Sequence, residues 1–124
     1  MTIAAIDFQM LANAGFPPAS YAAGEVIFAE GDRGDAMFVV RTGEVTIERG
    51  GRVMETLSGG GVFGEMALID GSPRSATVRA KTDCEVAPIN EKTFLFLVHE
   101  TPFFAIAVMR TLADRLRRMD EGAA

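Results

Sequence analysis

The chain has 124 residues, 48% of them hydrophobic, and a formal net charge of −5. This length corresponds to one domain, which buries about two-thirds of the surface that its unfolded chain exposes. The negative net charge argues against a domain that itself binds DNA or RNA, since such domains are usually basic. The single cysteine, Cys84, cannot form an internal disulfide, which favours a reducing, cytoplasmic compartment.

No apolar run approaches the roughly 20 residues that a bilayer span needs. The first 15 residues lack a basic segment and contain Asp7, so they do not resemble a signal peptide. We therefore expect no direct contact with a membrane.

Residues 1–20 are expected to form an N-terminal helical segment. Asp7 suits the N-cap of a short amphipathic helix, and Gly15 with Pro17-Pro18 would end it.

Residues 21–89 have a different sequence pattern, in which short runs of β-forming residues are separated by turns that contain glycine. Strands at such close spacing are typical of an antiparallel sandwich, roll or barrel. The Gly50-Gly51 pair is the clearest hairpin signal, because a two-residue turn needs the positive φ that glycine adopts without strain. The predicted strand runs are Val26–Phe28, Met37–Val40, Val45–Ile47, Val53–Met54, Thr77–Val78 and Val86.

Residues 90–121 predict two C-terminal helices. Asn90 is a suitable N-cap for the first, and Thr101-Pro102 is a start signal for the second, which should run to about Met119 with Gly122 as its stop. Apolar residues with heptad spacing form a seam along one face of the second helix. Two interpretations stay open: the seam packs on the domain's own strands, or it pairs with a second copy in a homodimer. The seam residues are Ala105, Met109, Leu112, Leu116 and Met119.

The segment between the predicted strands, residues 57–78, carries the strongest chemical signal. Its glycine-rich start leads into Glu65–Ile69, which can form only a turn or two of helix before Gly71. The N-terminus of such a helix presents unpaired backbone N–H groups and the positive end of its dipole, a combination that suits an anion.

An arginine and a glutamate extend this anion site. Ser72-Pro73 reverses the chain and brings Arg74 within reach of the same anion, where a guanidinium forms charge-assisted, often bidentate hydrogen bonds. Glu65 would repel an inorganic phosphate, but its carboxylate can accept hydrogen bonds from a sugar hydroxyl. Together these groups indicate a phosphorylated ribose as the ligand.

The runs Phe63–Leu68 and Pro73–Val78 resemble the phosphate-binding cassette of the cyclic nucleotide-binding domains of catabolite-activator-type transcription factors, cyclic nucleotide-dependent kinases and nucleotide-gated channels. The similarity extends from about Tyr21 to the end of the chain. It implies a mainly β fold, an antiparallel β-roll of jelly-roll (double-stranded β-helix) type with a short N-terminal helix, a short cassette helix and two C-terminal helices. It also implies that residues 1–124 form a single domain, with the cassette at 63–78.

The same resemblance implies a role for each cassette residue. Arg74 would contact the cyclic phosphate and Glu65 the ribose 2′-hydroxyl, while backbone amides and the Ser75 hydroxyl would line the sugar-phosphate. Serine at position 75 favours cAMP and leaves cGMP open. The ligand-binding set is Phe63, Gly64, Glu65, Met66, Ala67, Arg74, Ser75 and Ala76.

Three alternatives compete with a nucleotide sensor. An enzyme is not expected, because the one histidine and one cysteine lie in no catalytic or metal-ligand pattern, and we expect no metal and no cofactor besides the nucleotide ligand. A complete transcription factor is not expected either, because only five residues follow Met119. A roll that binds no nucleotide and only pairs through its last helix is the remaining alternative. The expected protein partner is a second copy of the chain, bound through that helix, or an unidentified effector protein.

Overall fold

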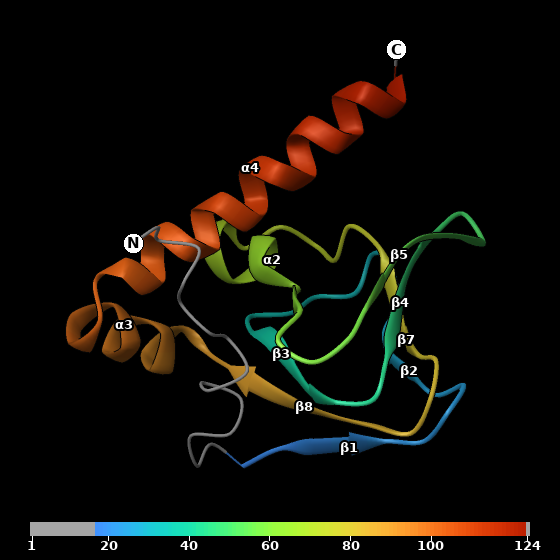
Figure 1. Ribbon diagram of the computed structural model, residues 1–124, viewed down its shortest axis with the longest axis horizontal. Coiled ribbons are helices and arrows are strands. Elements are labelled where there is room, and N and C mark those ends of the chain that lie inside the picture. Colours follow the sequence, from blue (N-terminus) through green and yellow to red (C-terminus); the bar gives the residue numbers. More distant parts are fainter. Residues whose placement is uncertain (1–16, 124) are drawn as a thin grey trace. The chain divides into compact units, whose positions relative to one another are not determined.

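The computed structural model describes residues 17–123, which fall into two compact units (Figure 1). The described part of the first unit ends at Glu91, and the second begins at Lys92. The helix expected after Asp7 lies outside the described residues.

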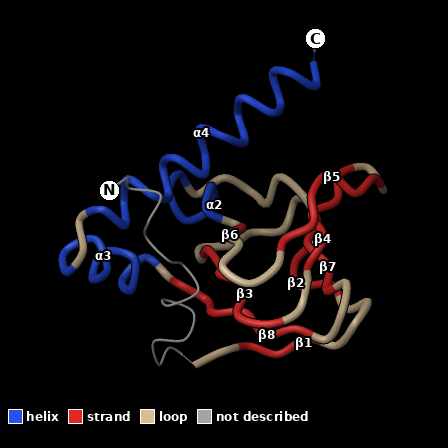
Figure 2. The backbone as a smooth tube through the Cα atoms, in the orientation of Figure 1, coloured by secondary structure: helices blue, strands red, loops and turns tan. Residues whose placement is uncertain are grey.

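The first unit contains eight strands in two four-stranded sheets, drawn in red in Figure 2. The order is β1-β8-β3-β6 in one sheet and β2-β7-β4-β5 in the other, and every neighbouring pair is antiparallel. This is the predicted antiparallel β-roll. The strands are β1 (Ala19–Tyr21), β2 (Val26–Phe28), β3 (Met37–Thr42), β4 (Val45–Arg49), β5 (Arg52–Leu57), β6 (Val62–Phe63), β7 (Thr77–Ala80) and β8 (Cys84–Ile89).

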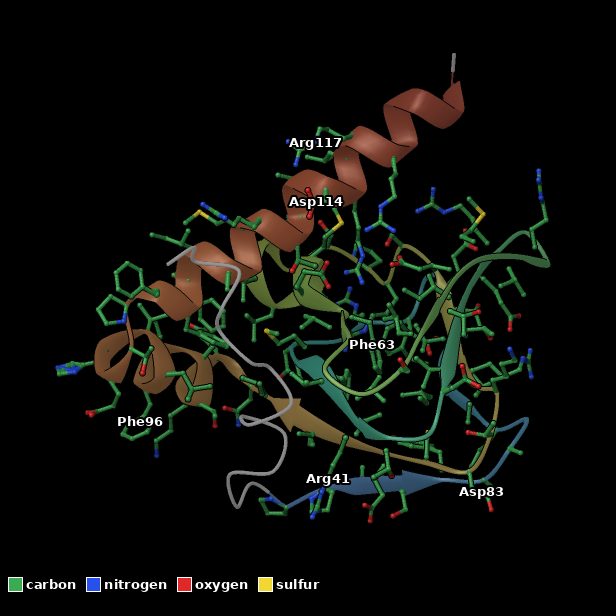
Figure 3. The ribbon with its side chains drawn as sticks, viewed as in Figure 1. Arg41, Phe63, Asp83, Phe96, Asp114 and Arg117 are labelled. Carbon is green, nitrogen blue, oxygen red and sulfur yellow. The ribbon has the colours of Figure 1, made fainter. Side chains whose placement is uncertain are left out.

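The core of this unit lies between the two sheets. Burial alternates along β7, as expected for a strand with one face inward. Phe63, labelled in Figure 3, is the largest side chain of the cluster and is 1% exposed. Cys84 is a buried free thiol, and burial raises its pKa. The cluster takes Val40, Phe63, Cys84 and Val86 from the first sheet and Val45, Val78 and Ala80 from the second.

The hairpin predicted at Gly50-Gly51 is confirmed. The two glycines have φ values of 58° and 78° and join β4 to β5, with Arg49 opposite Arg52. Positive φ at both central residues defines the type I′ turn that matches the twist of paired strands.

Two short strands were missed in the sequence. β1 contradicts the end of the segment assigned as helical, residues 1–20, because Ala19 and Ser20 pair with β8 directly after Pro17-Pro18. β6 has only two residues, and a run of glycines precedes it. Neither strand has an alternating pattern of its own, since each is defined by its pairing with a longer strand.

The second unit consists of α3 (Glu91–Glu100) and α4 (Phe103–Ala123), and the ring of Phe94 on α3 meets that of Phe104 on α4 edge-on at 5.3 Å. Both predicted helices are confirmed, but Gly122 does not stop α4, which continues to Ala123. A glycine inside a helix costs about 1 kcal/mol relative to alanine and does not forbid the helix. None of the described helices is by itself long and apolar enough to cross a membrane; α3 and α4 together meet that length and composition, with a 118° bend between them.

The apolar seam predicted on α4 is not the stripe that is buried. Met109 and Leu116 are 56% and 60% exposed. The buried side chains are instead Phe104, Ala107 and Val108.

Two glycines with the same backbone conformation separate backbone strain from steric overlap. Gly43 has a φ of 79° and Gly51 a φ of 78°, but a Cβ at Gly43 would overlap the carbonyl oxygen of Asp83, whereas a Cβ at Gly51 would meet nothing within 4 Å. We expect Gly51→Ala to lower the free energy of unfolding by about 1 kcal/mol, the cost of the left-handed conformation. Gly43→Ala should cost about 3 kcal/mol or more, because the overlap is added.

Urea denaturation followed by circular dichroism measures both differences. Equal losses for the two variants would contradict the close approach of residue 43 to the chain at Asp83.

Candidate functional site

The predicted cassette helix is present as α2 (Glu65–Asp70), between β6 and β7 (Figures 1 and 2). Gly64 precedes it with a φ of 78°, and Gly71 ends it with a φ of 70° while donating its N–H to the carbonyl of Ala67 at 3.0 Å. Both glycines hold conformations that other residues adopt only with strain. The sequence from Gly64 to Gly71 therefore fixes the length of α2.

Two backbone hydrogen bonds tie Arg74, which follows α2, to the loop between β2 and β3. The Arg74 N–H donates to the carbonyl of Asp32 at 2.8 Å, and the Gly31 N–H donates to the Arg74 carbonyl at 2.8 Å. This reciprocal pair sets the point from which the Arg74 side chain leaves the backbone.

The Arg74 side chain is buried, with only 7% of the residue exposed. Its Nη1 donates to the carbonyl of Gly64 at 3.0 Å, so the arginine reaches back to the start of α2. Its Nε is fully buried and has no hydrogen-bond acceptor in the described part of the chain. A buried donor without an acceptor is rare in native proteins, so a partner from outside the described chain, such as water, an ion or a ligand, is expected at this atom.

Aromatic rings contact the guanidinium. Its Cζ lies 4.1 Å from the ring centroid of Phe28 on β2 and 5.7 Å from that of Phe38 on β3. Phe63 packs against both rings, at 5.9 Å from Phe28 and 5.1 Å from Phe38. The guanidinium therefore lies next to the cluster of aromatic rings formed by Phe28, Phe38 and Phe63.

Two glycines make room for the guanidinium. A Cβ at Gly34 would overlap its Nε, Cζ and Nη2 atoms, and a Cβ at Gly64 would lie 2.7 Å from Nη1. No larger residue fits at either position unless the arginine moves. Gly34 and Gly64 thus form two walls of the Arg74 site.

Burial lowers the pKa of Arg74, and the negative charges of Asp35, Asp32 and Glu65 act in the opposite direction. An arginine remains protonated in proteins even so. Glu65 is itself only 3% exposed. The site thus combines a buried cation, a nearby buried carboxylate and a guanidinium N–H without an acceptor, which is the chemistry of an anionic ligand that also carries a hydroxyl donor.

The structure brings part of the predicted residue set together. Gly64, Glu65 and Arg74 meet at the start of α2, whereas the Phe63 side chain belongs to the core. Ser75 is exposed, and its carbonyl accepts a hydrogen bond from Nε of Arg49 at 3.2 Å. Of the remaining positions, Ala67 and Ala76 are buried and Met66 is exposed.

Sequence reasoning did not place Phe28, Gly34 and Asp35 in the site. Phe28 resembles any other strand residue in the sequence, because its contact with Arg74 joins positions 46 residues apart in the chain. The glycines of residues 31–35 are the only available signal, and by themselves they indicate no more than a turn. Among the described side chains, those of residues 17–118, no three His, Cys, Asp or Glu gather in a group that could hold a metal ion.

The family model of the cyclic nucleotide-binding domain matches residues 18–101. The chain belongs to this family. It is 36% identical over 115 residues to the cyclic AMP receptor protein of Thermus thermophilus, covering 89% of this chain and 53% of that one. It is 40% identical over 93 residues to a cyclic nucleotide-gated potassium channel of Rhizobium etli, covering 75% and 26%.

Solved structures agree with this assignment. The catabolite activator protein of Thermus thermophilus matches with a TM-score of 0.82 and 33% identity, over 96% of this chain and 58% of that one. A regulatory-subunit domain described as "Sp-2Cl-cAMPS bound to PKAR CBD2" matches with a TM-score of 0.76 and 30% identity, over 87% and 72%. The chain spans about half the length of the curated Thermus relative and about a quarter of the channel.

The Gly34 wall can be tested without altering Arg74. In Gly34→Ala the new methyl group meets only the end of a flexible side chain, and the backbone at residue 34 is not in the left-handed region. We expect the guanidinium to move while the free energy of unfolding changes by no more than about 1 kcal/mol.

Nuclear magnetic resonance of the Arg74 Nε–H group and urea denaturation give the two readouts. An unmoved Nε–H signal in Gly34→Ala would contradict the close approach of this glycine to the guanidinium.

Proposed function

We propose that this domain binds cAMP as a sensor, with Arg74 holding the cyclic phosphate and Glu65 accepting a hydrogen bond from the ribose 2′-hydroxyl. The observation that carries the proposal is the buried Arg74 guanidinium, whose Nε has no acceptor in the described chain. A cyclic phosphate supplies a negative charge and several acceptor oxygens. In a site of low dielectric constant, each charge-assisted hydrogen bond to it contributes about 1.5–3 kcal/mol.

The remaining cassette residues complete the proposed contacts. The amides of Gly64, Met66 and Ala67 would face the sugar-phosphate, together with the amide and hydroxyl of Ser75. Phe63 and Ala76 would support this surface from the core, since both are buried. Ser75 is exposed, which leaves its hydroxyl accessible to a ligand.

The choice of cAMP over cGMP rests on residue 75 and on the relatives. The Thermus relative is named a cyclic AMP receptor protein, and a solved relative contains a cAMP analogue. Another structure, with a TM-score of 0.77 and 28% identity over 94% of this chain, is described under the words "A cyclic-GMP-dependent signalling pathway regulates bacterial phytopathogenesis". Both nucleotides therefore belong in the first experiment.

The domain is proposed to act by binding alone, as a single regulatory unit of residues 1–124 in the cytoplasm, without direct contacts to nucleic acid or membrane. The cyclic AMP receptor and channel relatives are regulatory proteins, which supports a non-enzymatic role. Its signal would pass to an effector protein or to a second copy of the chain. The exposed Met109 and Leu116 on α4 support a homodimer through that helix.

Calorimetric titration with cAMP and then cGMP tests the phosphate contact. We expect Arg74→Ala to weaken binding of both nucleotides about 100-fold or more, because the charge-assisted hydrogen bonds are lost. The affinity of Arg74→Lys should lie between those of the unaltered domain and Arg74→Ala, since lysine keeps the charge but lacks the planar set of N–H donors.

Arg41→Ala is the matched control for net charge. Arg41 lies on β3 beside Glu85, with a distance of 3.9 Å from Nε to Oε1. This variant should bind as the unaltered domain does. No binding of either nucleotide by the unaltered domain would favour a roll that acts only through protein contacts.

The proposed ribose contact can be tested with 2′-deoxy-cAMP. We expect Glu65→Gln to weaken cAMP binding about tenfold, because a neutral amide oxygen replaces the charged acceptor of the 2′-hydroxyl. The same variant should bind 2′-deoxy-cAMP nearly as well as the unaltered domain, because the pair is already broken. An equal loss for both nucleotides would show that Glu65 acts on something other than the 2′-hydroxyl.

A further inference from the structure

Phe28 occupies a special position beside Arg74. Its ring centroid is 4.1 Å from Cζ of the guanidinium, a shorter distance than the 5.7 Å to Phe38. Phe28 lies at the end of β2, and its backbone is held opposite Val78 of β7. β2 and β7 are neighbours in one sheet, and β7 begins at the end of the cassette. The Phe28 ring is therefore attached to the strand next to the one that the cassette leads into.

A ring and a phosphate use different parts of a guanidinium. The aromatic ring attracts the flat face of the cation, whereas hydrogen bonds form at its edge, in the plane of the N–H groups. Contact with Phe28 therefore holds the cation without consuming any donor. Nη1 already donates to the Gly64 carbonyl, and Nε, which has no acceptor in the described chain, is the donor left for an anion.

Carboxylates would hold the same cation in a different way. Asp32, Asp35 and Glu65 all act on the charge of Arg74. An ion pair with any of them would occupy the N–H edge and compete with a phosphate. The ring contact attracts the same cation without occupying that edge.

The contact between Phe28 and Arg74 affects binding through the conformational entropy of the arginine side chain. A free arginine loses much of its rotamer freedom when it is fixed against a ligand. Phe28, Gly34 and Gly64 surround the guanidinium and restrict the positions that it can occupy. Affinity is then higher because less freedom remains to be lost on binding.

We propose that Phe28 is a positioning residue for nucleotide binding, which acts by holding the face of the Arg74 guanidinium and leaving its N–H edge for the cyclic phosphate. This inference rests on the proposed function of Arg74 and adds a residue to it. It also gives a reason for an aromatic side chain at the end of β2.

The test compares Phe28→Leu, Phe28→Tyr and the matched control Phe38→Leu. We expect Phe28→Leu to weaken cAMP binding about tenfold, or about 1.4 kcal/mol. Phe28→Tyr should bind within about threefold of the unaltered domain, because it restores a ring face. Phe38→Leu removes a ring from the same aromatic cluster at a greater distance from Cζ, and it should have the smaller effect.

A spectroscopic readout separates positioning from general damage to the core. In the ligand-free domain, the Arg74 Nε–H proton should show a ring-current shift that is lost in Phe28→Leu and kept in Phe28→Tyr and Phe38→Leu. In the Arg74→Lys background, which lacks the planar cation, Phe28→Leu should no longer weaken binding tenfold.

The outcomes distinguish this inference from the proposed function. Loss of binding in Arg74→Ala but unchanged binding in Phe28→Leu would overturn the role of Phe28 and keep the site. An equal loss in Phe28→Leu and Phe38→Leu would also overturn it, since both would then act through the core. No nucleotide binding by the unaltered domain would overturn the proposed function, and an Nε–H signal unaffected by Phe28→Leu would then overturn the positioning itself.

Discussion

The buried guanidinium of Arg74 is the constraint on which the rest of the site depends. Removing a cation from water is unfavourable unless other groups attract it, and here a carbonyl, an aromatic ring and several carboxylates do so. Each of these groups must be close to the same few atoms. Gly34 and Gly64 follow from that requirement, because a Cβ at either residue would occupy the space of the guanidinium.

The topology of the roll explains why these groups can meet. β2 and β3 belong to different sheets, and so do β6 and β7, so residues 29–36 and 64–76 both cross from one sheet to the other. The hydrogen bonds between Arg74 and residues 31 and 32 join the two crossings. The strands themselves contribute mainly core, and the connections between sheets are where polar groups can gather without breaking a ladder of backbone hydrogen bonds.

The parts of the site that sequence could predict are local. Gly64, the α2 turns, Gly71 and Arg74 lie within eleven residues, and their chemistry follows from helix ends and charge. The hairpin at Gly50-Gly51 is local in the same sense. The contact of Phe28 with Arg74 depends on strand register, which no short pattern specifies.

The sequence missed strand β1 and did not single out the buried stripe of α4, for a related reason; pairing of the predicted seam with a second copy stays a prediction. Ala19–Tyr21 is a strand because it pairs with β8. A three-residue sequence is too short to predict that pairing. On α4 the sequence allows more than one apolar stripe. The heptad rule selects Met109 and Leu116, while burial follows Phe104 and Val108. A pattern fixes the period of a helix, but tertiary packing decides which face is covered.

A buried arginine also links the stability of this domain to its ligand. Burial of Arg74 lowers its pKa, because a low dielectric constant disfavours the charged form. The same low dielectric constant strengthens any interaction with an anion that reaches the guanidinium. A ligand that binds only the folded state stabilises that state in proportion to the logarithm of its concentration above the dissociation constant. The burial that disfavours the charge of Arg74 is therefore also what would make a bound anion stabilise the folded state most strongly.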